Sequence, residues 1–235
     1  MKFFRFFRRP KYKTIKMLEE FVGEDGTGMN LIDEGKFSEA LIYFDNMLRK
    51  YPRSVYFRAS KALALIGLKR YGEAVPYLDE IVQISDYWKK EYHPTFCDLS
   101  DVTCSALFNK ALCMMAMNNK AEISVCYNKV FEISEFLSAL DKDYYERIYS
   151  KVPDEHKANH PIGNYYRVLP YRLRIHLRRS EIDELIKDLS EFLTECPPHF
   201  LDMAKQELHA ALMEDREYES IKNNPQLLEL LEKTS

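Results

Sequence analysis

The stretch FSEALIYFDNMLRKYP, from Phe37 to Pro52, decides the fold of this chain, because its pattern returns 34 residues later as YGEAVPYLDEIVQISD, from Tyr71 to Asp86. In both copies the apolar residues recur at steps of three and four, which places them on one face of an α-helix. In the first copy these positions are Phe37, Ala40, Leu41, Phe44, Met47 and Leu48. Pro52 ends the first helix, since proline cannot continue one. A repeat of this length predicts tandem helical hairpins.

A turn and a small set of marker residues accompany each copy. In the first copy the markers are Gly28, Gly35-Lys36-Phe37, Ala40, Phe44 and Pro52. In the second copy they are Ala62, Tyr71, Ala74 and Leu78, while Asp86 stands in the place of the proline. This series resembles the tetratricopeptide repeat. The resemblance implies an all-α fold in which helical hairpins stack into a right-handed solenoid.

Two further copies extend the repeat. A third is visible from Ala106 to Ile133, displaced by an insertion at 87–103. A degenerate fourth copy lies at about 166–199, where the apolar spacing of the first copy returns and Pro197 replaces Pro52. We therefore expect three clear units, a degenerate fourth unit and capping helices. We expect the chain to divide into a basic aromatic arm with an amphipathic helix (1–22), repeats 1 to 3 (23–137) and carboxy-terminal helices (138–235).

Composition narrows the class of protein. Hydrophobic residues make up 46% and charged residues 30%, which is typical neither of disorder nor of a membrane protein. The five cysteines form no C-x-x-C pair, which indicates a reduced, cytoplasmic protein. Glycine is scarce, and the one cluster (Gly23, Gly26, Gly28) fits neither a phosphate loop nor a dinucleotide fingerprint. We expect no cofactor.

Catalytic and metal-binding patterns are weak. His156 and His160 are four residues apart, which suits two metal ligands on a helix, but Pro153 and Pro161 bracket them and favour a loop. Cys97, Asp98 and Cys104 resemble a ligand cluster, but no second pair follows and packing explains the thiols. No local signature brings a base to a nucleophile. We expect a protein that is not an enzyme and holds no metal.

Two segments, 55–68 and 104–117, are apolar around most of the helical circumference. Such helices need cover on more than one side. In the tetratricopeptide family the first helix of each unit lines a concave groove. The resemblance implies a groove lined by Tyr56, Ala59, Leu63, Ile66, Phe108, Leu112 and Met115.

That groove is covered either by the chain's own carboxy-terminal helices or by a helix or peptide of a partner. The function expected from the resemblance is a non-catalytic protein–protein interaction or scaffold module. Its partner is a protein or peptide, and self-association into a homo-oligomer is a further option.

Charge is distributed unevenly. The net charge is −3, yet residues 1–16 carry seven positive charges and no acid, interleaved with phenylalanines. A second basic region follows Glu155, where Arg167, Arg174 and Arg178 fall on one helical stripe beside Tyr171. An adaptor for nucleic acid or an anionic membrane, using residues 1–13 and this stripe, is the alternative function. The acidic body disfavours nucleic acid, and a solvated stripe paired with acids is the simpler interpretation.

Overall fold

The computed structural model describes residues 26–90, 95–147, 151, 164–196 and 198–232, and the regular structure of these residues is entirely helical. The all-α class predicted from the sequence is therefore confirmed over the described ranges. Two predicted features, the 1–22 arm and the His156/His160 pair, lie outside them. No helix within the described ranges is both long enough and apolar enough to cross a membrane.

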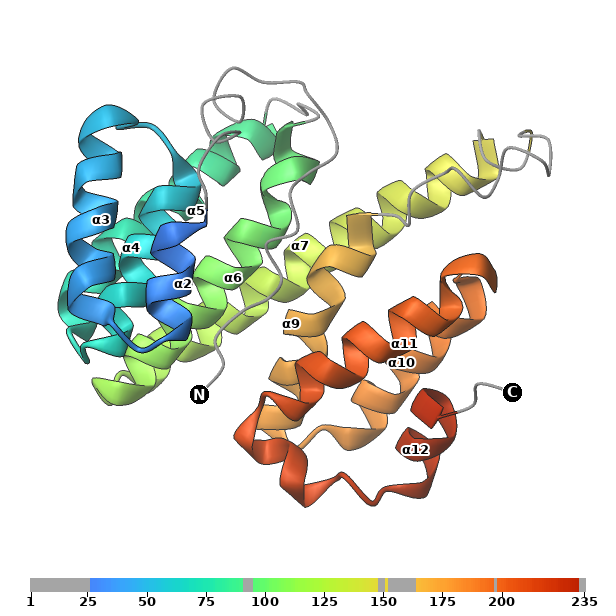
Figure 1. The fold of residues 1–235 in the computed structure, drawn as a ribbon. Coiled ribbons are helices and arrows are strands. Elements are labelled where there is room, and N and C mark those ends of the chain that lie inside the picture. The colour runs from blue at the N-terminus through green and yellow to red at the C-terminus, as the bar shows by residue number, and fades with distance from the viewer. Residues whose placement is uncertain (1–25, 91–94, 148–150, 152–163, 197, 233–235) are drawn as a thin grey trace. The chain divides into compact units, whose positions relative to one another are not determined.

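The chain forms two compact units, residues 1–129 and 130–235, which are described separately. The helices of the first unit are α2 (Thr27–Asp33), α3 (Phe37–Lys50), α4 (Val55–Gly67), α5 (Tyr71–Lys90), α6 (Thr95–Ala116) and the first part of α7 (Lys120–Arg147). Each helix from α2 to α5 packs against the next one, and α2 and α6 both pack on α4 (Figure 1). The boundary between the units falls inside α7, whereas the sequence led us to place a boundary at residue 137.

The second unit contains the rest of α7 and a group of helices around one core. These helices are α9 (Asn164–Arg179), α10 (Ile182–Glu195), α11 (Pro198–Met213), the 3-10 helix η2 (Arg216–Ser220) and α12 (Pro225–Glu232). Both α9 and α12 pack on α10 and α11. Leucines on α9, α10 and α11 dominate the core, and Leu169, Leu185 and Leu208 are among those with no exposed surface.

The helix pairs α2–α3, α4–α5, α6–α7 and α9–α10 are joined by the same turn, and we call them hairpins 1 to 4. Each turn has one residue with left-handed φ, two positions before the second helix: Gly35 (75°), Lys69 (59°), Asn118 (58°) and Ser180 (59°). The N–H of that residue donates to the carbonyl three residues back, and the next N–H donates to the carbonyl five residues back. This Schellman arrangement satisfies the last carbonyls of the first helix.

Burial in the second helix of hairpins 1, 2 and 4 follows the register of the repeat. The positions of Ala40, Phe44 and Met47 are buried again in hairpin 2 and hairpin 4. In hairpin 2 they are Ala74, Leu78 and Ile81, and in hairpin 4 they are Leu185, Leu189 and Phe192. The degenerate fourth copy therefore keeps both the turn and the buried face of the first.

The insertion predicted at 87–103 lengthens two helices. Because Asp86 stands where the first copy has Pro52, α5 continues to Lys90, and α6 already begins at Thr95. Asp86 lies within the extended helix and pairs with Lys129 of α7 at 2.5 Å. Most of the extra residues are therefore helical.

Candidate interaction site

Most of the residues predicted to line a groove on α4 and α6 are buried. Tyr56, Ala59 and Ile66 pack in one core cluster with residues of α5 and α6. Leu63 and Phe108 are also buried, Leu112 is half-buried, and Met115 is 38% exposed. An all-apolar helix is covered on several sides by its neighbours, and periodicity alone does not distinguish that packing from a binding face.

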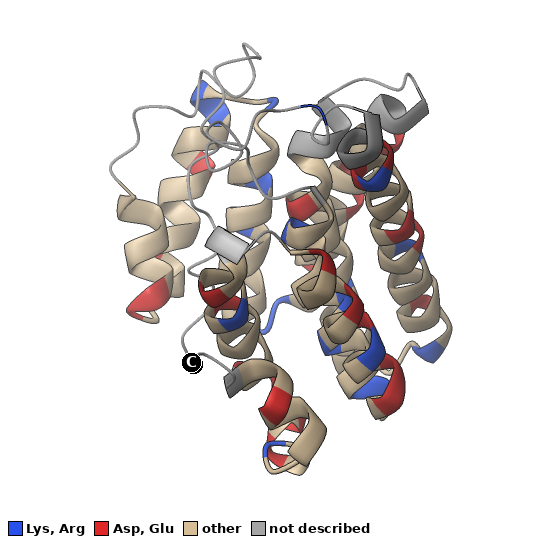
Figure 2. Ribbon diagram, turned by 90° about the vertical axis from the view of Figure 1, so that its right-hand side faces the viewer, with Lys and Arg blue, Asp and Glu red and all other residues tan. Residues whose placement is uncertain are grey.

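The arginine stripe also differs from an open cationic surface. Arg174 is buried, and its Nε lies 3.4 Å from a carboxylate oxygen of Asp215. Arg178 Nε lies 2.7 Å from the same oxygen, while Tyr171 is buried and Arg167 half-buried. Burial lowers the pKa of Arg174 below its usual value, although Asp215 acts in the opposite direction. Figure 2 shows acidic and basic residues interspersed along the helices.

Asp215 is the residue that the sequence analysis missed. Its carboxylate has no exposed surface, and it accepts hydrogen bonds from Arg174, Arg178 and the backbone N–H of Glu217 at the start of η2. These hydrogen bonds therefore hold the segment after α11 against α9. No local pattern signals this pairing, because the two arginines precede Asp215 by 41 and 37 residues.

A cation recurs at one position of the first helix in hairpins 2, 3 and 4, eight residues before the left-handed turn residue. These cations are Lys61, Lys110 and Arg172. Lys61 lies 2.5 Å from Asp45 of the preceding helix and donates to the Tyr77 hydroxyl of the following one. Lys110 bridges the neighbouring helices in the same way, through Asp79 at 2.8 Å and Glu122 at 3.3 Å.

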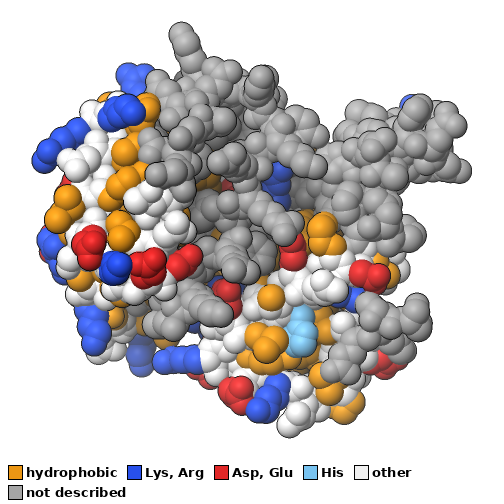
Figure 3. Space-filling model, in the orientation of Figure 1, with side chains coloured by type: hydrophobic (Ala, Val, Ile, Leu, Met, Phe, Trp, Pro, Cys, Tyr) orange, Lys and Arg blue, Asp and Glu red, His pale blue; other side chains and the backbone are white. Residues whose placement is uncertain are grey.

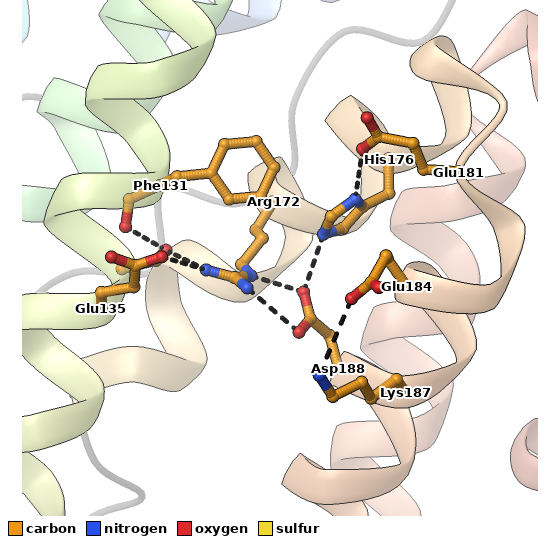
Figure 4. A network of polar contacts seen from close by, with 9 residues as sticks. Phe131, Glu135, Arg172, His176, Glu181, Glu184, Lys187 and Asp188 are labelled. Carbon is orange, nitrogen blue, oxygen red and sulfur yellow. Dashed lines mark hydrogen bonds and ion pairs between the residues drawn. The ribbon is translucent and has the colours of Figure 1, made fainter.

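Arg172 performs the same bridging in hairpin 4 with a richer set of contacts (Figure 4). Its guanidinium hydrogen-bonds both carboxylate oxygens of Asp188 on α10. Toward α7 it lies 3.6 Å from Glu135, donates to the Ser134 hydroxyl at 3.2 Å, and covers the Phe131 ring at 4.7 Å. A forked, planar cation suits these simultaneous contacts better than lysine does.

Asp188 also contacts His176, whose Nε2 lies 2.9 Å from a carboxylate oxygen of Asp188. Burial raises the pKa of Asp188, but hydrogen bonds from His176 and Arg172 outweigh burial and hold that pKa below its usual value. The carboxylate is 6% exposed. It is therefore kept ionised as the common acceptor of two side chains of α9.

An open groove lies between α10, α11 and α12. It has a volume of about 440 Å³. Its apolar wall consists of Ile186, Leu193, Leu201 and Leu230, and its polar lining of Ser190, Thr194, Lys205, Gln226 and Glu229.

Other apolar side chains at the surface are scattered. Among the described residues, Ile42, Val125 and Met213 are the most exposed large ones, at 65%, 58% and 61%. On the face drawn in Figure 3, hydrophobic side chains form small groups among charged ones. Single exposed apolar residues are ordinary on a folded protein, so the groove is the more informative feature.

The cysteines Cys113 and Cys126 are buried. Burial raises the pKa of Cys113 and of Cys126 to about 11, so both are thiols at neutral pH. Within the described ranges, histidine, cysteine and carboxylate side chains form no group that could hold a metal ion.

Comparisons with protein-family models and with solved structures found no match to this chain. The resemblance to the tetratricopeptide repeat therefore stands on the residues of the sequence.

Proposed function

We propose that this chain is a helical-repeat module of the tetratricopeptide type, a right-handed stack of hairpins that binds a protein or peptide partner and does not catalyse a reaction. The four identical turns support it, because tandem copies of one supersecondary unit are typical of stacked repeats. The cations at equivalent positions support it further, since each links a hairpin to the helix before it.

The groove between α10, α11 and α12 carries the proposed binding activity. Four aliphatic side chains form its wall, and Lys205 and Glu229 are its charged lining residues. Concave apolar surfaces with a few polar groups are the usual form of a site that anchors bulky side chains. The proposed occupant is a short peptide segment with one or two large aliphatic or aromatic side chains, which enter the groove while polar groups of the peptide meet its lining.

Selection from a random peptide library on the full chain tests this function. We expect enriched peptides to carry large apolar residues and to lose at least tenfold in affinity when Leu193→Glu places a charge in the groove. Ser190→Phe, which fills the groove without adding charge, should have the same effect. Lys187→Glu is the matched control on α10, because Lys187 is exposed and does not line the groove. Equal binding to all four proteins would contradict the proposal.

The basic arm supports a second candidate function, contact with an anionic membrane surface. Residues 1–16 carry seven positive charges among four phenylalanines, a composition suited to interfacial binding. The arginine stripe adds little to it, because Arg174 and Arg178 are paired with Asp215. Flotation with phosphatidylserine vesicles compares the full chain with a chain lacking residues 1–13. Equal flotation of the two chains would contradict this second function.

A further inference from the structure

His176 stands between two carboxylates in the last turn of α9. Its Nδ1 lies 2.8 Å from an oxygen of Glu181, and its Nε2 lies 2.9 Å from an oxygen of Asp188 (Figure 4). Glu181 precedes α10 in the turn of hairpin 4, and Asp188 lies within α10. The imidazole therefore connects the end of one helix of the hairpin with two points of the other.

The geometry selects one protonation state of the ring. An ionised carboxylate only accepts hydrogen bonds, and a neutral imidazole has a single N–H to donate. Both contacts are hydrogen bonds only when both ring nitrogens carry a proton. In the neutral ring, one lone pair would face a carboxylate oxygen less than 3 Å away.

The surroundings of the His176 ring act on its charge in both directions. The dipole at the end of α9 stabilises a cation, whereas Arg172 and Arg179 disfavour a further positive charge. The His176 ring meets the Phe131 ring of α7 edge to face at 4.9 Å. The other charged groups around it are Arg172 and Arg179, which both contact the Phe131 ring. Glu135 of α7 lies beyond Arg172, at 3.6 Å from its guanidinium.

The backbone and the side chain of His176 both make contacts that hold the turn of hairpin 4. The His176 carbonyl accepts the Glu181 N–H at 2.9 Å, which is one of the two hydrogen bonds that close the Schellman turn. The Glu181 carboxylate is 39% exposed and can rotate into solvent, whereas Asp188 is held by Arg172 as well. When the imidazolium loses one of its two N–H protons, the contact with Glu181 is therefore the first to break.

We propose that protonated His176 stabilises hairpin 4. Its imidazolium holds the turn between α9 and α10 in place, and its deprotonation breaks the contact with Glu181 and destabilises that turn. Histidine is the side chain whose charge can change between pH 5 and 8, so the contact with Glu181 weakens as the pH rises. The proposal is independent of peptide binding in the groove.

Two measurements on the full chain test this proposal. The ¹⁵N chemical shifts of the His176 ring should show both nitrogens protonated at pH 6, and a neutral ring at that pH would overturn the proposal. The amide protection factors of Ser180 and Glu181, corrected for intrinsic exchange, should fall roughly tenfold between pH 6 and pH 8.5, the size expected for one charge-assisted hydrogen bond.

Variants separate this effect from general destabilisation. His176→Gln and Glu181→Gln should each abolish the pH dependence of protection at the turn. Glu181→Gln keeps the size of the side chain and leaves the contact between His176 and Asp188 in place. His209→Gln is the matched control, since His209 Nε2 faces the hydroxyl of Tyr218 at 2.7 Å. Protection that varies with pH equally in all four proteins would overturn the proposal.

Discussion

Ser180 adopts the same left-handed backbone conformation as Gly35, with φ of 59° against 75°. Both residues donate their N–H to the carbonyl three residues back, Ser180 to Leu177 and Gly35 to Ile32. Only glycine enters this region without a steric cost from Cβ. Hairpin 4 therefore keeps the turn of hairpin 1 although its sequence does not favour the conformation.

Substitutions to and from glycine should measure the steric cost of the left-handed conformation. Ser180→Gly is expected to raise the free energy of unfolding by about 0.5 to 1 kcal/mol, and Gly35→Ala to lower it by about 1 to 2 kcal/mol. Gly72→Ala is the control, because Gly72 lies in the first turn of α5 with nothing within 4 Å of a new Cβ. It should raise stability by about 0.5 to 1 kcal/mol. Urea unfolding measures all three, and a loss at Gly72 as large as that at Gly35 would contradict the interpretation.

Gly67 should resist substitution for a different reason. A Cβ built there lies 2.4 Å from the ring of Phe37, so an alanine would displace an aromatic side chain at the start of α3. We expect Gly67→Ala to cost about 1 to 3 kcal/mol, the range of an overpacked core. The double variant Gly67→Ala/Phe37→Leu should recover part of that loss in urea unfolding. A double variant as unstable as the sum of the single changes would argue against the contact.

Removal of the Asp215 carboxylate should be far more damaging than the loss of a surface pair. Asp215→Asn removes the buried negative charge that Arg174 and Arg178 share, and breaking one partner of a buried pair costs about 3 to 5 kcal/mol. Arg216→Gln breaks the exposed pair with Glu217 one residue further on and should cost less than about 0.5 kcal/mol. Thermal unfolding of both variants measures the difference. Similar losses would show that the two arginines do not depend on Asp215.

The sequence predicted the elements that arise from local patterns. Because apolar spacing determines which face of a helix is buried, the spacing of Leu185, Leu189 and Phe192 was enough to assign them to a fourth copy. The binding surface could not be predicted in the same way. Tyr56 and Ile66 have the pattern of a groove, but the cover that α5 and α6 give them depends on tertiary packing. Arg174 and Arg178 likewise have the spacing of a surface stripe, and only the fold brings Asp215 beside them.

Asp188 should make the stability of the second unit dependent on acid pH. Its folded-state pKa lies below the usual value, so its contribution is present above about pH 4 and is lost as the pH falls through the folded pKa. Asp188→Asn should cost about 3 kcal/mol at pH 7, because Arg172 and His176 lose their common acceptor. Protonation makes wild-type Asp188 resemble asparagine, so the difference between the two proteins should shrink toward pH 3. Urea unfolding at both pH values measures it, with the exposed Asp183→Asn as control, and a difference that stays constant from pH 7 to pH 3 would show that this carboxylate does not carry the effect.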